Sequence, residues 1–184
     1  GVALIQRAAE LGFPPAMVLV AKYMGRGEYL EKDAEGAWLL LIKTLKTDHA
    51  AAKIRAALEF LPGGVGPENP KRTKKVLQGL INEGNSAAMI SYAMKVLDLQ
   101  KAEIGSDNSK KGITLLERAA LEEKDSQAAI YLSLLFNQGN VVPRDQKKAI
   151  TFAQLAIDAG VIRAYGTMGP VSYTHLRAHE TDYY

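Results

Sequence analysis

Cysteine is absent from this chain of 184 residues, which also contains only one tryptophan and three histidines. Without cysteine there is no disulfide and no thiolate metal site. The formal net charge of +3 is too small to indicate nucleic acid or an anionic membrane surface as a partner. No apolar run approaches the roughly 18 residues that a membrane-spanning helix needs. The hydrophobic content of 47% nevertheless suffices for a buried core.

Signals of catalysis are also missing. The sequence has no Gly-x-Ser-x-Gly elbow and no phosphate-binding loop, and His49 is the only histidine outside the C-terminal tail. The adjacent carboxylates Glu122 and Glu123 fall at a predicted helix end, where solvent exposure is their usual role. We therefore expect no catalytic, cofactor-binding or metal-binding residue, and a protein that is not an enzyme.

A repeat governs the chain. The segments ELGFPPAM, KTDHAAAK, NEGNSAAM, EEKDSQAA and DAGVIRAY align, and their alanines lie at intervals of 36, 36, 40 and 36 residues. The seventh residues of these segments are Ala16, Ala52, Ala88, Ala128 and Ala164. The same frame places three glycines and two polar residues at a turn, namely Gly12, Asp48, Gly84, Lys124 and Gly160.

A helix-capping residue follows each of the first four alanines at a fixed offset. Side-chain oxygens of such residues accept hydrogen bonds from the exposed N–H groups of a helix start. The predicted caps are Asp33, Asn69, Asp145 and, after a four-residue insertion, Ser109. We expect two antiparallel helices per period, a helix A starting near the alanine and a helix B following the cap. The predicted pairs are 16–26/33–47, 52–61/69–83, 86–98/109–123 and 126–138/145–159.

The fold class predicted from this pattern is all-α. A single helix pair cannot bury its apolar face, so neighbouring pairs must stack into a right-handed α/α solenoid of about four and a half repeats. The repeats are 16–51, 52–87, 88–127 and 128–163, with partial repeats at 1–15 and 164–169. Trp38 lies in the apolar run 38–42 of a helix B, and we expect it to pack in the core.

The fourth repeat carries the fullest pattern: Ala128, Leu132, Phe136, Gly139, Val142, Asp145, Lys148, Ala149, Ala156 and Gly160. This pattern resembles the Sel-one-like repeat (SLR), a relative of the tetratricopeptide repeat (TPR). The chain departs from the pattern where Thr73 replaces the alanine of the second helix B, and where the third inter-helix loop lacks the usual glycines. The resemblance covers residues 1–169 and implies a bacterial protein–protein interaction scaffold with a TPR-like helical fold.

The resemblance also implies a binding face. In tetratricopeptide-type solenoids the A helices line the concave groove, so the groove-facing phase carries over to six residues of this chain. The predicted partner-binding residues are Lys22, Arg26, Arg55, Ser91, Tyr131 and Gln138. Arginine offers a planar fork to carboxylates, which favours an acidic segment or a C-terminal carboxylate of a protein or peptide partner. The alternative is that these are ordinary solvated helix positions.

Other functions stay open beside the scaffold. Some SLR proteins have been described as β-lactam hydrolases, which would require a nucleophile or metal site that the sequence does not show. A structural spacer within a larger protein would leave the groove empty. The basic run 71–75 follows the predicted cap Asn69 and has no interleaved aromatic residue, so we interpret it as a solvated face and do not expect nucleic acid as a partner.

The two ends of the chain look like cuts rather than natural termini. Gly1 runs straight into the helical pattern ALIQRAAELG, so a signal peptide is not expected to be visible. The localisation, cytoplasm or bacterial periplasm and envelope, therefore stays open. Pro170 breaks the fifth helix A, and nothing after it matches an earlier period.

The tail VSYTHLRAHET resembles a translated sequencing adapter. The mosaic-end bases GTC TCT TAT ACA CAT CT encode its first six residues, and CCGAGCCCACGAGAC completes the segment in the same frame. We expect 170–184 to be a non-native tail, with 171–184 as adapter read-through. The alternative is a metal site at His175 and His179, whose four-residue spacing places both imidazoles on one helical face.

Deletion of residues 171–184 is expected to leave helix content and melting temperature unchanged. The reason is that an adapter-encoded segment has not been selected to pack on the solenoid. Circular dichroism measures both quantities, and calorimetry is expected to show that the tail binds zinc no better than the free peptide. A loss of helix content on deletion contradicts the adapter interpretation, and the source nucleotide read provides an independent check.

Overall fold

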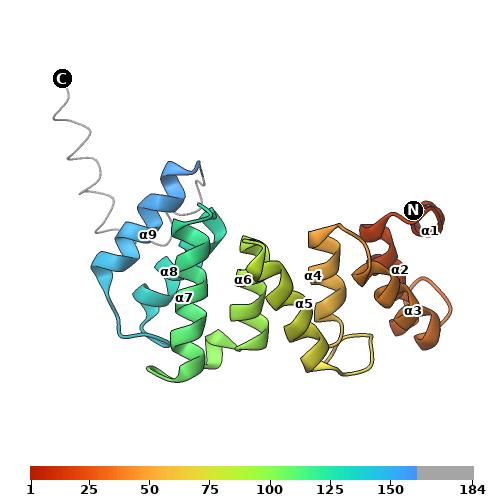
Figure 1. The fold of residues 1–184 in the computed structure, drawn as a ribbon, viewed down its shortest axis with the longest axis horizontal. Coiled ribbons are helices and arrows are strands. Elements are labelled where there is room, and N and C mark those ends of the chain that lie inside the picture. The colour runs from red at the N-terminus through yellow and green to blue at the C-terminus, as the bar shows by residue number, and fades with distance from the viewer. Residues whose placement is uncertain (161–184) are drawn as a thin grey trace. The chain divides into compact units, whose positions relative to one another are not determined.

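The computed structural model describes residues 1–160, and all regular elements in this range are helical (Figure 1). The chain divides into two compact units, unit 1 from Gly1 to Glu83 and unit 2 beginning at Gly84. Both units are built from consecutive helix pairs in which the first member is a helix A and the second a helix B. The all-α solenoid class predicted from the repeat is confirmed.

Unit 1 contains five helices: α1 (Val2–Glu10), α2 (Pro14–Arg26), α3 (Ala34–Leu45), α4 (Ala50–Leu58) and α5 (Pro70–Asn82). Helix α2 packs against α3 and helix α4 against α5, which are the first two predicted pairs. Helix α1 packs on α2, and α3 packs on α4, so these two helices also contact the A helix that follows them. The A helices α2 and α4 contact each other as well.

Unit 2 contains the next two pairs. The first A helix, α6 (Ser86–Ser91), continues as a π-helix, η1 (Tyr92–Val96), and is followed by a 3₁₀ turn, η2 (Leu99–Lys101). Its partner is α7 (Asp107–Leu121), and the second pair consists of α8 (Ser126–Gln138) and α9 (Gln146–Asp158). Helix α7 packs on α6, η1 and α8, and α8 packs on α9.

Three of the four predicted caps are confirmed. The carboxylate or amide oxygens of Asp33, Asn69 and Asp145 accept hydrogen bonds from the backbone N–H three residues later, at 2.8, 3.0 and 3.0 Å. A second set of caps, on the A helices, was not predicted from the sequence. There His49 accepts through Nδ1, and Asn85 and Asp125 accept through side-chain oxygens. These caps explain why α4 begins two residues before Ala52.

The prediction of Ser109 as a cap was wrong. Helix α7 is capped by Ser106, whose Oγ accepts from the Ser109 N–H at 3.2 Å, after a turn at Gly105 with φ of 77°. Ser109 itself is buried, and its hydroxyl donates to the carbonyl of Val141 at 2.7 Å. The four inserted residues are divided between loop and helix. Only one lengthens the loop, and α7 has 15 residues where α3 has 12 and α5 has 13.

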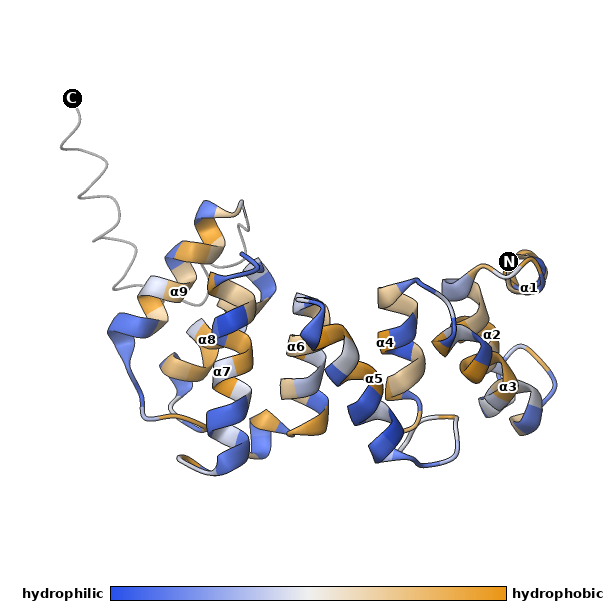
Figure 2. Cartoon of the chain, viewed as in Figure 1, coloured by the Kyte–Doolittle hydropathy of each residue, from blue (hydrophilic) through white to orange (hydrophobic). Residues whose placement is uncertain are grey.

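The prediction that Trp38 packs in the core was also wrong. Trp38 is 37% exposed and its neighbour Leu39 is 55% exposed. The buried stripe of α3 runs instead through Ala37, Leu41 and Thr44, at the three- and four-residue spacing of a helix face. Trp38 follows the first member of that stripe directly, which turns it about 100° away. Figure 2 shows how apolar and polar residues alternate around the individual helices.

The loop between α4 and α5 folds back onto helix α2. Val65 in this loop packs against the buried cluster around Ala21, Leu41 and Phe60. It lies so close to Gly25 that a Cβ added there would come within 2.5 Å of the Val65 Cβ. Gly25 is therefore required by packing, although glycine is unfavourable inside a helix. Gly79 in α5 is a contrasting case, since nothing lies within 4 Å of its added Cβ.

Replacing these two glycines by alanine is expected to change stability in opposite directions. Gly79→Ala gains helix propensity without a clash and should stabilise by about 0.5–1 kcal/mol. Gly25→Ala forces Val65 aside and should destabilise by about 1–3 kcal/mol. Urea denaturation measures both changes, and Val65→Ala in the Gly25→Ala background should recover part of the loss. Equal stabilisation by the two alanines would show that Val65 does not pack on α2.

Candidate functional site

The A helices of unit 1 border an apolar groove. The groove has a volume of about 630 Å³ and is formed by α1, the turn before α2, and helices α2 and α4. Its apolar lining includes Leu4, Phe13, Leu19 and Leu58, and its charged lining consists of Lys22, Arg55 and Glu59. Leu4 and Phe13 are 76% and 55% exposed, so a ligand in the groove would bury apolar surface. Two of the six predicted binding residues, Lys22 and Arg55, are thus brought together.

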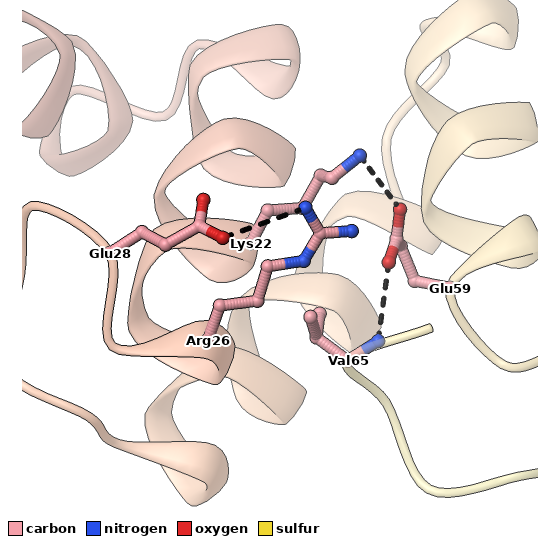
Figure 3. A network of polar contacts seen from close by, with 5 residues as sticks. All are labelled: Lys22, Arg26, Glu28, Glu59 and Val65. Carbon is pink, nitrogen blue, oxygen red and sulfur yellow. Dashed lines mark hydrogen bonds and ion pairs between the residues drawn. The ribbon is translucent and has the colours of Figure 1, made fainter. Parts of the chain in front are cut away.

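Lys22 is engaged within the protein. Its Nζ lies 3.3 Å from Oε1 of Glu59, and Oε2 of Glu59 accepts a hydrogen bond from the Val65 N–H at 3.2 Å (Figure 3). The Glu59 side chain is only 12% exposed, whereas that of Lys22 is 35% exposed. Glu59 therefore joins helix α2 to the folded-back loop and neutralises the charge of Lys22.

Arg26 lies outside the groove lining. Its Nη1 is 3.9 Å from Oε1 of Glu28, and both side chains are about half exposed (Figure 3). Such a long contact between solvated groups contributes little to stability. Of the two arginines predicted in unit 1 as partner-binding residues, Arg26 is thus the weaker candidate.

Arg55 is the cation of the groove without an internal counter-ion. It projects from α4 as an exposed residue, and within the described part of the chain it makes no ion pair or side-chain hydrogen bond. Since Lys22 and Glu59 balance each other, the lining carries a net charge of +1 that resides on Arg55. The arrangement suits a carboxylate next to apolar side chains.

The remaining three predicted residues lie in unit 2. Tyr131 and Gln138, both on α8, line a hollow of about 280 Å³ together with Met94 of η1. Ser91 does not line this hollow and is half-buried at the end of α6. The structure therefore brings Tyr131 and Gln138 together and leaves Ser91 apart from them.

Residues 1–160 offer no cluster of three histidine or acidic side chains that fits a metal ion. His49, the histidine in this range, has its Nδ1 occupied by the cap of α4. The alternative metal site at His175 and His179 lies outside the described residues. Among the helices of residues 1–160, none is both long and apolar enough to cross a membrane.

Most of the groove lining was not predicted from the sequence. Leu4, Phe13 and Leu19 were not assigned to a binding surface, because the segment 1–15 was treated only as a partial repeat. Glu59 was missed as well, although a lone carboxylate in the apolar stretch AALEFL is a usable signal of an internal ion pair. Gln100 and Asn140 in the unit 2 hollow were missed because they lie in loops, outside the helical phase used for the prediction.

No family model and no curated protein matches this chain. Two solved structures resemble it in fold. The Sel1 repeat protein from Oxalobacter formigenes has a TM-score of 0.56 and 20% identity, and the match covers 91% of this chain and 47% of that one. The second is c5321, a protective antigen present in uropathogenic Escherichia coli strains displaying an SLR fold. It has a TM-score of 0.60 and 19% identity, with 95% of this chain and 37% of that one covered.

These likenesses show the fold. The protein is an SLR-like α-solenoid, as the resemblance at the sequence level predicted. The chain spans less than half the length of either solved structure. Helical repeats of this kind form extended surfaces that are typical of protein-interaction modules.

A double-mutant cycle should detect the contact between Lys22 and Glu59. We expect a coupling free energy of about 0.5–1 kcal/mol from Lys22→Met and Glu59→Gln, because Glu59 is mostly buried. The matched cycle at Arg26 and Glu28, with the same substitutions, should give a value near zero. Urea denaturation of the single and double variants measures both. Equal coupling in the two pairs would show that Lys22 is as solvated as Arg26.

Proposed function

We propose that the protein is a non-catalytic scaffold whose unit 1 groove binds an acidic, apolar peptide segment of a partner protein. The observation that carries this proposal is Arg55, a cation without an internal partner beside an apolar groove on the A helices. The SLR-like fold supports the general role, since such repeats are typical of interaction modules.

The chemistry of the lining defines the ligand. Exposed side chains such as Leu4 and Phe13 favour apolar partner residues, and full burial of one leucine-sized side chain contributes about 1.5–3 kcal/mol. The guanidinium of Arg55 can donate two parallel hydrogen bonds to one carboxylate. Lys22 supplies no comparable free charge, because Glu59 holds it at 3.3 Å. We therefore place Arg55 at the centre of recognition, with Lys22 beside it in the groove lining. The other predicted residues, Arg26, Ser91, Tyr131 and Gln138, do not line this groove, and Tyr131 and Gln138 belong to the separate hollow of unit 2.

The ligand class can be tested by selecting a phage-displayed random peptide library on the full chain. We expect the selected peptides to combine an aspartate or glutamate with leucine or phenylalanine. Arg55→Glu should weaken their binding at least about 10-fold, the effect of losing a charge-assisted hydrogen bond. Lys53→Glu is the matched control, since Lys53 lies on the same helix but does not line the groove. Lys53→Glu should change the affinity less than about 3-fold, because salt screens a charge that lies outside the groove. Fluorescence polarisation measures the affinity of each variant.

Two outcomes would contradict the proposal. Failure to select any peptide would favour a structural spacer. Binding that survives Arg55→Glu but is lost when Lys71, Lys74 and Lys75 are neutralised would place the site on α5 instead. These three lysines are exposed and make no ion pair within residues 1–160. Circular dichroism of each variant checks that helix content is unchanged.

A further inference from the structure

The third repeat contains a local departure from α-helical geometry. Helix α6 ends after six residues, and η1 continues it with π-type hydrogen bonding, in which the Leu97 N–H donates to the Tyr92 carbonyl at 3.0 Å. Asp98 then takes a left-handed conformation, with φ of 45°, before the 3₁₀ turn η2. Short π segments inside helices occur frequently at functional sites.

This departure forms one wall of the hollow in unit 2. Met94 from η1 and Gln100 from η2 face Tyr131 and Gln138 of α8 across about 280 Å³. Asn140 and Val141 also line the hollow. The buried hydroxyl of Ser109 holds the Val141 carbonyl at 2.7 Å, so helix α7 fixes the loop that carries Asn140.

The polar groups of the hollow are all uncharged. Three carboxamides and one phenol line it, from Gln100, Gln138, Asn140 and Tyr131. None of these four side chains makes a hydrogen bond within the described part of the chain. Of the charged residues next to the lining in sequence, Asp98 and Lys101 pair with each other at 3.1 Å, and the exposed Lys95 does not line the hollow. The floor is apolar and is formed by Met94, Leu134, Leu135 and Val141.

We infer that this amide hollow binds an uncharged hydrogen-bonding side chain of a peptide, asparagine or glutamine. A carboxamide presents both donors and an acceptor and so matches the carboxamides and the phenol of the lining. A carboxylate or ammonium group would lose water without meeting an opposite charge. The volume of about 280 Å³ lies just below the range of pockets for drug-sized ligands, so it has room for a side chain together with its flanking backbone. The inference rests on the proposed function only in taking the ligand to be a peptide, since the groove around Arg55 belongs to unit 1.

The test is an NMR titration of the full chain with four capped tripeptides, Ac-Ala-Xaa-Ala-NH₂, where Xaa is Asn, Asp, Lys or Leu. We expect the Asn peptide to shift the side-chain amide signals of Gln100, Gln138 and Asn140, with an affinity at least about 10-fold above the other three. Tyr131→Phe and Gln138→Ala should each weaken binding several-fold. Gln127→Ala is the matched control on α8, because Gln127 is exposed and does not line the hollow.

Each other outcome would overturn the inference. These outcomes are equal or better binding of a charged or leucine peptide, no shift at millimolar concentration, and equal effects of Gln138→Ala and Gln127→Ala. Arg55→Glu separates the two sites, since it should leave the Asn titration unchanged. Loss of the acidic peptides with intact Asn binding would contradict the unit 1 groove alone. The reverse result would contradict the amide hollow alone.

Discussion

Close approach of helices at the alanine positions is the constraint on which this structure depends. Ala16, Ala52, Ala88 and Ala128 stand near the starts of successive A helices, with exposed fractions of 7, 1, 0 and 0%. At the fully buried positions Ala52, Ala88 and Ala128, a larger side chain would push its packing neighbours away, because protein interiors are packed without spare volume. The alanine spacing therefore fixes the period, and the period in turn fixes where caps, turns and loops must lie.

The elements that follow from explicit local chemistry were predictable. Helix starts were predicted from residues whose side-chain oxygens cap them, namely Asp33, Asn69 and Asp145. Most helix bounds agree with the prediction within two residues. In the third repeat, prediction from local sequence was less successful. Sequence spacing reveals that four residues are inserted but not how loop and helix share them, and Ser109 was misassigned for that reason. Trp38 was misplaced because a run of five apolar residues does not by itself define which face of a helix is buried.

The candidate site was less predictable, because side-chain pairing across the fold changes which charges are available. The position of each residue on its helix predicted Lys22 and Arg55 equally as binding residues. Of the two, however, only Lys22 forms an ion pair with Glu59. Glu59 is held in turn by the Val65 N–H, in a loop that packs on α2 only because residue 25 is glycine. These contacts join three separate segments of unit 1. None of the segments, taken alone, predicts that Lys22 is paired and Arg55 is not. The π-helix at Tyr92 has no recognisable sequence pattern at all.

Both proposed binding sites lie at irregular repeats. A regular helix pair presents the same small and apolar residues in each period, so it specifies stacking rather than a ligand. In the second repeat a folded-back loop holds Glu59, which neutralises Lys22 and leaves Arg55 as the free charge of an apolar groove. The third adds a π-helix and a longer loop that gather uncharged amides. The two proposed sites thus differ in chemistry, and each depends on residues at positions where the repeat pattern is broken.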